Sequence, residues 1–153
     1  MAVGKSGSFA SGETLDFQKL NDAVGNEWVT GWSPSWSGIT IGNATVLGRY
    51  RYVGSSLEIA VSVTVGSTTV RTGNVQITLP SSHSSLTGSH SVGNFYNYQS
   101  STTGQQGTAI CGSNATKVSL YLGTLGNMRV ANPATFATGD FLWFQISVGL
   151  ATT

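Results

Sequence analysis

The feature that most constrains the fold is a strict alternation of apolar side chains with polar or small ones at residues 56–65. The apolar positions of this run are Leu57, Ile59, Val61, Val63 and Val65. Successive side chains of a β-strand point to opposite faces, so a period of two predicts a strand with one buried face. A helix of this length would instead repeat its apolar residues every three or four positions.

Two further strands are predicted next to this run. Residues 45–53 (TVLGRYRYV) place two tyrosines on one face of a strand and two arginines on the other. Gly54-Ser55-Ser56 joins this strand to the alternating run at 56–65 as a tight hairpin. Val75, Ile77 and Leu79 alternate up to Pro80, which has no N–H for a ladder and ends the strand.

Weaker strand patterns complete the fold prediction. They cover residues 38–41, 91–98, 107–111, 117–122 and 141–150. The total is seven or eight short strands, and no helical pattern follows Gly25. We therefore expect an all-β fold: an antiparallel β-sandwich, most simply a jelly roll, that occupies residues 28–153.

Residues 1–27 differ from the rest, because they hold four of the six acidic residues. Phe17, Leu20 and Val24 have the spacing of one helical face, and Asp16 and Gly25 suit the two ends of a helix. A helix of about nine residues is not stable alone in water, so it must dock on another surface. The sequence thus predicts an N-terminal arm with one short helix.

Length and charge narrow the functional classes. The 153 residues suit one domain, and only 8% are charged, with a net charge of +1. We expect no nucleic-acid partner, because phosphate binding needs many cations. No run of 18 apolar residues exists, and no apolar stretch follows Met1, so we expect no membrane partner and synthesis in the cytoplasm. The single Cys111 follows an apolar run and is interpreted as buried.

Residue patterns for catalysis are weak. Beyond the arm the only carboxyl side chains are Glu58 and Asp140, and both are interpreted as structural. His83 and His90 stand among serines without a nucleophile elbow or an acidic partner, which leaves open only a ring of histidines on a trimer axis. Gly-rich phosphate loops are lacking. We expect no enzymatic activity, no cofactor and no metal.

The aromatic residues offer candidates for contacts. Trp32 and Trp36 are interpreted as packing in the core or between subunits. Tyr96 and Tyr98 lie beside Ser- and Asn-rich segments, so they are either plain strand residues or a platform for a glycan. The run FLWF at 141–144 is apolar on both faces, which indicates burial from two sides or a contact between subunits through Trp143 and Phe144.

Several short motifs occur in a fixed order along the chain. They are GETL and LN at 12–15 and 20–21, WSPSW at 32–36, G-x-Y-x-x-x-G at 48–54, GSTT at 66–69 and LP at 79–80. Together they resemble small β domains of tailed bacteriophages, especially those of actinobacteria. Such domains occur in head decoration proteins and head fibres, and at the C-terminal ends of minor tail proteins.

The resemblance implies a structural protein of the virion surface, most simply a homotrimeric capsid decoration protein with its β domain facing outward. It implies attachment to the major capsid protein or to tail proteins through the arm, for which Leu15, Phe17, Leu20 and Val24 are the apolar candidates. In the tail proteins this domain ends a longer chain, whereas here it begins near residue 12, which favours decoration. The alternative is a tail-associated adsorption protein that binds a host cell-surface glycan.

Overall fold

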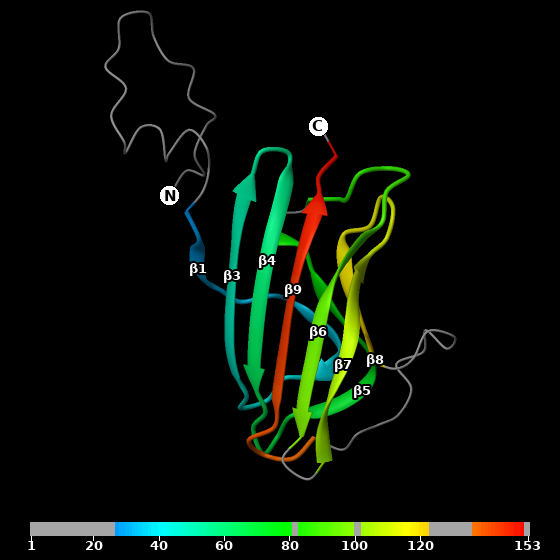
Figure 1. Cartoon of the computed structure of the whole chain (residues 1–153). Helices are drawn as coiled ribbons and strands as arrows, with labels where there is room; N and C mark the ends of the chain where they lie inside the picture. The colour runs from blue at the N-terminus through cyan, green and yellow to red at the C-terminus, as the bar shows by residue number, and fades with distance from the viewer. Residues whose placement is uncertain (1–26, 81–82, 100–101, 123–135, 152–153) are drawn as a thin grey trace, which may run out of the picture.

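The computed structural model describes residues 27–80, 83–99, 102–122 and 136–151, which form one antiparallel sheet of nine strands (Figure 1). The strands are β1 (Val29–Trp32), β2 (Trp36–Thr40), β3 (Thr45–Val53), β4 (Ser56–Thr64), β5 (Val70–Thr78), β6 (Ser91–Gln99), β7 (Thr102–Cys111), β8 (Lys117–Leu122) and β9 (Phe141–Gly149). The predicted arm and helix, with Leu15, Phe17, Leu20 and Val24, lie outside the described residues.

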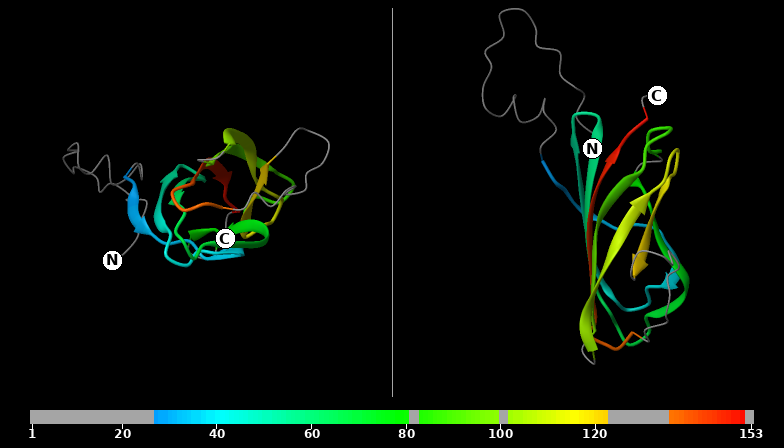
Figure 2. Two further views of the ribbon diagram at one scale, coloured as in Figure 1. Left: turned by 90° about the horizontal axis from the view of Figure 1, so that it is seen from below. Right: turned by 45° about the vertical axis from the view of Figure 1, so that its right-hand side comes forward.

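The order of the strands curls the sheet on itself. Neighbours pair in the order β1-β3-β4-β9-β6-β7-β8-β5-β2, so the two end strands are consecutive in the chain. The residues between them, 33–35, lead from one edge of the sheet to the other, and Ser35 O accepts a hydrogen bond from Thr78 N at 3.0 Å. Seen along its axis, the sheet forms a ring (Figure 2, left).

The last strand of the chain occupies the middle of the sheet. β9 pairs with β4 over nine residue pairs, from Ser56↔Gly149 to Thr64↔Phe141, and with β6 on its other side. The spatial order β9-β6-β7-β8 is that of a Greek key, in which the fourth strand returns to lie beside the first.

The all-β, antiparallel prediction is confirmed, and so are most of the predicted strands. The hairpin of β3 and β4 closes through Gly54 and Ser55, with Val53 opposite Ser56. Gly54 has a φ of 58°, which glycine adopts without steric cost. β5 ends before Pro80 as expected, but it begins at Val70, earlier than the alternation indicates. β1 (VTGW) was not predicted, because this strand is short and irregular at Gly31, which has a φ of 73°.

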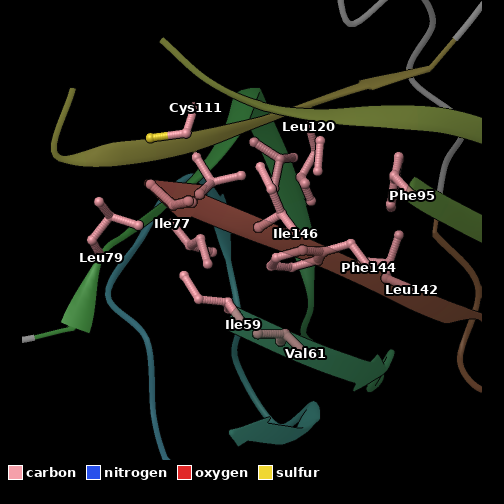
Figure 3. Close-up of a cluster of buried hydrophobic side chains, with 14 of the residues drawn as sticks. Ile59, Val61, Ile77, Leu79, Phe95, Cys111, Leu120, Leu142, Phe144 and Ile146 are labelled. Atoms are coloured by element: carbon pink, nitrogen blue, oxygen red, sulfur yellow. The ribbon is translucent and has the colours of Figure 1, made fainter. Parts of the chain in front are cut away.

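The inner face of the ring is the hydrophobic core (Figure 3). The alternating residues of β4 point inward as predicted and meet those of β9, β5, β6 and β8. The largest fully buried apolar side chains are Phe144, Leu57, Ile59, Ile77 and Ile146. Each such side chain contributes about 1.5–3 kcal/mol by leaving water. Cys111 is fully buried in the same cluster, which confirms its predicted role.

Two glycines let strands approach where a side chain would not fit. A Cβ at Gly93 of β6 would lie 2.1 Å from Gln145 O of β9, and one at Gly107 of β7 would lie 2.0 Å from Tyr121 O of β8. Both contacts are with backbone, so the strands themselves would have to move. These glycines therefore set how closely the central strands pack.

Candidate functional site on the outer face of the sheet

Apolar and aromatic side chains collect on the outer face of β3, β9 and β6. We call this surface the aromatic face, and it consists of Leu47, Tyr96, Tyr98, Phe141 and Trp143. All five alternate with inward residues of their strands. Leu47 is 68% exposed and Tyr98 48% exposed, while the other three are half-buried. An uncharged patch of this kind marks a contact surface more often than a solvent face.

The strand register explains why these residues meet. Trp143 lies directly opposite Tyr96, and Phe141 directly opposite Tyr98. On the other side of β9, Trp143 faces Ser62, which in turn faces Leu47 of β3. Side chains opposite each other on one face of an antiparallel pair have Cβ atoms about 4.5–5.5 Å apart. The register thus builds one row of side chains across four strands.

Small neutral polar side chains surround this row. Thr64, Asn94 and Gln145 are exposed on the same outer face. Charge begins at the exposed Arg49, two residues along β3 from Leu47, and continues at the end of β3 and β4, where Arg51 Nε donates to Glu58 Oε2 at 2.6 Å. The five residues of the aromatic face carry no charge themselves, and Arg49 is the cation nearest to Leu47 along β3.

The arginines of β3 also contact a tryptophan from the start of the described chain. The ring of Trp28 lies 4.7 Å from the guanidinium carbon of Arg49 and 4.8 Å from that of Arg51. Cation–π contacts of this kind favour one position for residues that enter β1. The point where the N-terminal region joins the sheet is therefore fixed beside β3.

The two predicted subunit-contact residues lie on opposite faces of β9. Phe144 points inward and is only 1% exposed, so a second subunit could not reach it in the folded chain. Its apolar character is explained by the core of its own chain. Trp143 points outward into the aromatic face, next to Tyr96. Of the pair, only Trp143 is placed for a contact between subunits.

The other aromatic candidates pack inward. Trp32 and Trp36 are partly buried against the core, in agreement with the packing interpretation. Trp32 makes an edge contact with Tyr50, with ring centroids 5.7 Å apart, and Tyr50 makes another with Tyr52 at 5.9 Å. The contact of Trp32 with Tyr50 packs the end of β1 against β3.

The two histidines have separate surroundings. His83 lies against Tyr52, with its Nε2 3.3 Å from the tyrosine hydroxyl. His90 precedes β6, is exposed, and lines a groove on another part of the surface. The serine-rich segment thus does not bring them together within one chain.

A buried amide on β6 was not identified from the sequence. Asn97 is fully buried, and neither polar atom of its side-chain amide has a hydrogen-bond partner among the residues that the structure describes. The alternation of FYNY could have shown it, because Asn97 shares the inward face of Phe95. An unsatisfied buried polar group costs about 1–3 kcal/mol. Asn97 is therefore a weak point of the core beneath the aromatic face.

The remaining reactive groups have structural contacts. Asp140 is buried, and its Oδ2 accepts a hydrogen bond from Ala137 N at 2.8 Å in the turn before β9. Burial raises the pKa of the Cys111 thiol above its ordinary value of 9.0, while a hydrogen bond with Ser85 opposes that rise. Within the described ranges, no three His, Cys, Asp or Glu side chains gather as metal ligands, and no helix could span a membrane.

Comparison with protein-family models, with curated proteins and with solved structures finds no match for this chain.

Proposed function

We propose that the chain is a structural protein of a tailed-phage virion, most simply a homotrimeric head decoration protein on the particle surface. In this proposal residues 1–27 attach to the major capsid protein or to tail proteins, and the β domain of residues 28–153 faces outward. The proposed structural role requires no catalysis, cofactor or metal. The motifs behind the resemblance support it through their positions in the fold.

Three of those motifs fall at structural junctions. WSPSW at 32–36 contains the segment that joins the two edges of the sheet. GSTT at 66–69 is the turn between β4 and β5, where Gly66 N donates to Thr69 Oγ1 at 3.0 Å. Gly48 of the third motif leaves space for Trp32 O, which would lie 2.2 Å from an added Cβ. Motifs that fix turns and close approaches are those that a shared fold requires.

We further propose that the curled sheet is a jelly roll. The order β9-β6-β7-β8 supplies one Greek key. β5 and β2 continue the sheet beyond β8, and β4 and β3 continue it beyond β9. A jelly roll combines two Greek keys in eight strands. The strand order supports this assignment by supplying one of these two keys, and β1 is then an addition at the edge.

The aromatic face is the single observation that carries the proposal of self-association. It is neutral, contains exposed Leu47 and Tyr98, and has Trp143 near its centre. Aromatic residues at the centre of a contact are the ones that carry most binding energy. We propose that this face packs between subunits of the trimer, because a closed ring would cover it in every copy.

The mass of the full chain in solution tests this assembly, together with two variants of the same strand and face. Trp143→Glu buries a charge in the proposed contact, whereas Ser147→Glu places the same charge four residues away. We expect a trimer mass by light scattering for the wild type and for Ser147→Glu, and a monomer mass for Trp143→Glu. A monomeric wild type, or a trimeric Trp143→Glu, would contradict the proposal.

Location on the particle is tested by antibody-gold labelling of intact virions in the electron microscope. Gold over the head lattice is the expected result, and gold at the tail tip would overturn the decoration role.

Attachment is tested by adding purified chain to particles that lack it. We expect Phe17→Asp or Leu20→Asp to abolish binding and Gln18→Asp, on another side of the predicted helix, to preserve it.

The second candidate function is adsorption to a host cell-surface glycan as a tail-associated protein. It is favoured by Tyr96 and Tyr98, which share one outer face with the amides of Asn94 and Gln145. Rings flanked by amides can stack on a sugar and bond its hydroxyls. Two results would favour this function over decoration. The wild-type chain would be retained on host cell walls while Tyr98→Ala would not, and gold would label the tail tip.

A further inference from the structure

A polar groove of about 590 Å³ lies on the outer side of β7, β8 and β5, apart from the aromatic face. Six of its lining residues can contact a polar ligand: Gln76, His90, Asn114, Lys117, Ser119 and Tyr121. None of them belongs to the aromatic face. The groove combines an aromatic ring, amides, a hydroxyl and a cation.

The floor of the groove is set by the alternation of β8. Val118 and Leu120 are buried in the core, so Lys117, Ser119 and Tyr121 point outward. Three alternate positions on one strand extend over about 13 Å. The ammonium group and the tyrosine ring therefore stand at opposite ends of one row, with a hydroxyl between them.

Neighbouring elements fix the groove in shape. Gln76 lies opposite Ser119 in the ladder, and its Nε2 donates to Ser119 Oγ at 2.9 Å. The wall at residues 112–116 is held against the segment before β6, because Ala115 N donates to Ser85 Oγ at 2.9 Å and Ser85 N donates to Ala115 O at the same distance. A site that is held before the ligand arrives loses less entropy on binding.

One wall residue has an uncommon backbone conformation. Asn114 has a φ of 51°, the only positive value at a non-glycine residue in the described chain. Asparagine tolerates this region better than most residues, but it still costs free energy. This residue lines the groove.

The groove carries one formal positive charge. Lys117 lines it, and no carboxylate does. The described acidic side chains are Glu27, Glu58 and Asp140; Glu58 pairs with Arg51, and Asp140 is buried in a turn. A concave site with a cation and no acids attracts anions. A single lysine is too few for nucleic acid, whose binding requires many phosphate contacts.

We propose that this groove binds an acidic saccharide, a hydroxylated sugar ring with a carboxylate or phosphate group. Tyr121 stacks on the ring, Ser119 and the amides of Gln76 and Asn114 bond its hydroxyls, and Lys117 pairs with its negative group. The inference rests on the groove alone and does not depend on the proposed virion role. It differs from the glycan alternative above, which uses Tyr96 and Tyr98 on the other half of the sheet.

Titration of the ¹⁵N-labelled full chain, followed by amide NMR shifts, tests the site. The probes are trigalacturonate as the carboxylate saccharide, glucose 6-phosphate as the phosphate sugar, maltotriose as the neutral sugar and inorganic phosphate as the bare anion. We expect one or both acidic sugars to shift residues 112–121, with at least tenfold weaker binding of maltotriose and of phosphate. The two acidic arms tell a carboxylate ligand from a phosphate one.

Variants assign the roles within the groove. Lys117→Gln should weaken binding of the acidic sugar about tenfold, which is about 1.4 kcal/mol, and leave maltotriose unchanged. Tyr121→Ala should abolish sugar binding, and Tyr121→Phe should retain most of it. Arg49→Gln is the matched control, because it removes an exposed cation outside the groove.

Three results would overturn the inference. They are no shifts with any probe at millimolar concentration, shifts that centre on the aromatic face instead of the groove, and equal binding of inorganic phosphate and the acidic sugars. The amide spectrum of each free variant shows whether it is folded, so a loss of binding is separated from a loss of structure.

Discussion

The aromatic face and the polar groove belong to one sheet and follow the same alternation, yet they differ in shape. Under the aromatic face, β4 and β9 pair without interruption over nine residue pairs. Under the groove, β5 and β8 pair over only three, Gln76↔Ser119 to Thr78↔Lys117, and the wall at 112–116 rises beside them. In this sheet, ladder length and the neighbouring loops therefore decide whether a surface is flat enough for another protein or hollow enough for a small ligand.

Two substitutions in the core should cause the greatest loss of unfolding free energy, and they test whether the two surfaces share one core. Phe144 lies inward beside Trp143, and Ile77 lies inward beside Gln76 of the groove. We expect Phe144→Ala to cost about 3–5 kcal/mol and Ile77→Ala about 2–5 kcal/mol, because each leaves a cavity. Urea unfolding should show one transition for both variants, followed by tryptophan fluorescence and by circular dichroism. Two separated transitions would mean that the halves fold independently.

The next effect compares the strand contacts beneath each surface. Gly93→Ala would force β6 from β9 under the aromatic face, and Gly107→Ala would force β7 from β8 beside the groove. We expect each to cost about 1–3 kcal/mol in urea unfolding, since overpacking displaces backbone. Gly112→Ala is the control, because no atom lies within 4 Å of its added Cβ. Equal stability of all three variants would contradict the close approaches.

A smaller effect concerns β7, the strand next to both surfaces. Burial raises the pKa of the Cys111 thiol in the folded chain. The contribution of this group to the free energy of unfolding is therefore fully present below the thiol's ordinary pKa of 9.0. As pH rises above that value, the unfolded chain loses the proton first, and stability falls until the folded pKa is passed. We expect a slope of at most about 1.4 kcal/mol per pH unit from this group. Cys111→Ala should unfold with a shallower pH dependence above pH 9, and identical slopes would refute the argument.

The smallest effect concerns the charged end of β3 and β4. Arg51 and Glu58 are 31% and 25% exposed, so solvent screens their ion pair. We expect Glu58→Gln to cost about 0.2–1 kcal/mol, and the loss to shrink in high salt. Thermal unfolding at low and high sodium chloride measures both. A loss that does not change with salt would indicate packing in place of charge.

Local pattern was enough to predict much of the fold. The alternation of residues 56–65 and the turn residues Gly54-Ser55 predicted the β3–β4 hairpin, because both signals act between neighbours in the chain. β1 escaped detection because Gly31 breaks its alternation and only pairing with β3 orders it. The place of β9 between β4 and β6 could not be predicted, since strand order depends on contacts distant in sequence.

The same limit applies to the two surfaces. Alternation shows that Lys117, Ser119 and Tyr121 share a face, but the partner Gln76 is 43 residues away from Ser119. Tyr96 and Trp143 were each singled out in the sequence, and nothing in it showed that they lie opposite each other. Single residues were thus predictable, while their combination into a site required the register of the sheet.

The central position of β9 has a consequence for how the protein is made. β4 and β6 are synthesised long before residues 141–149, and until these emerge both strands have an unpaired edge. Unpaired edges of apolar strands pair readily with other chains. Nascent copies close together on one messenger would thus be exposed to mispairing until residues 141–149 emerge, and the emergence of this strand is the event that allows the sheet to close.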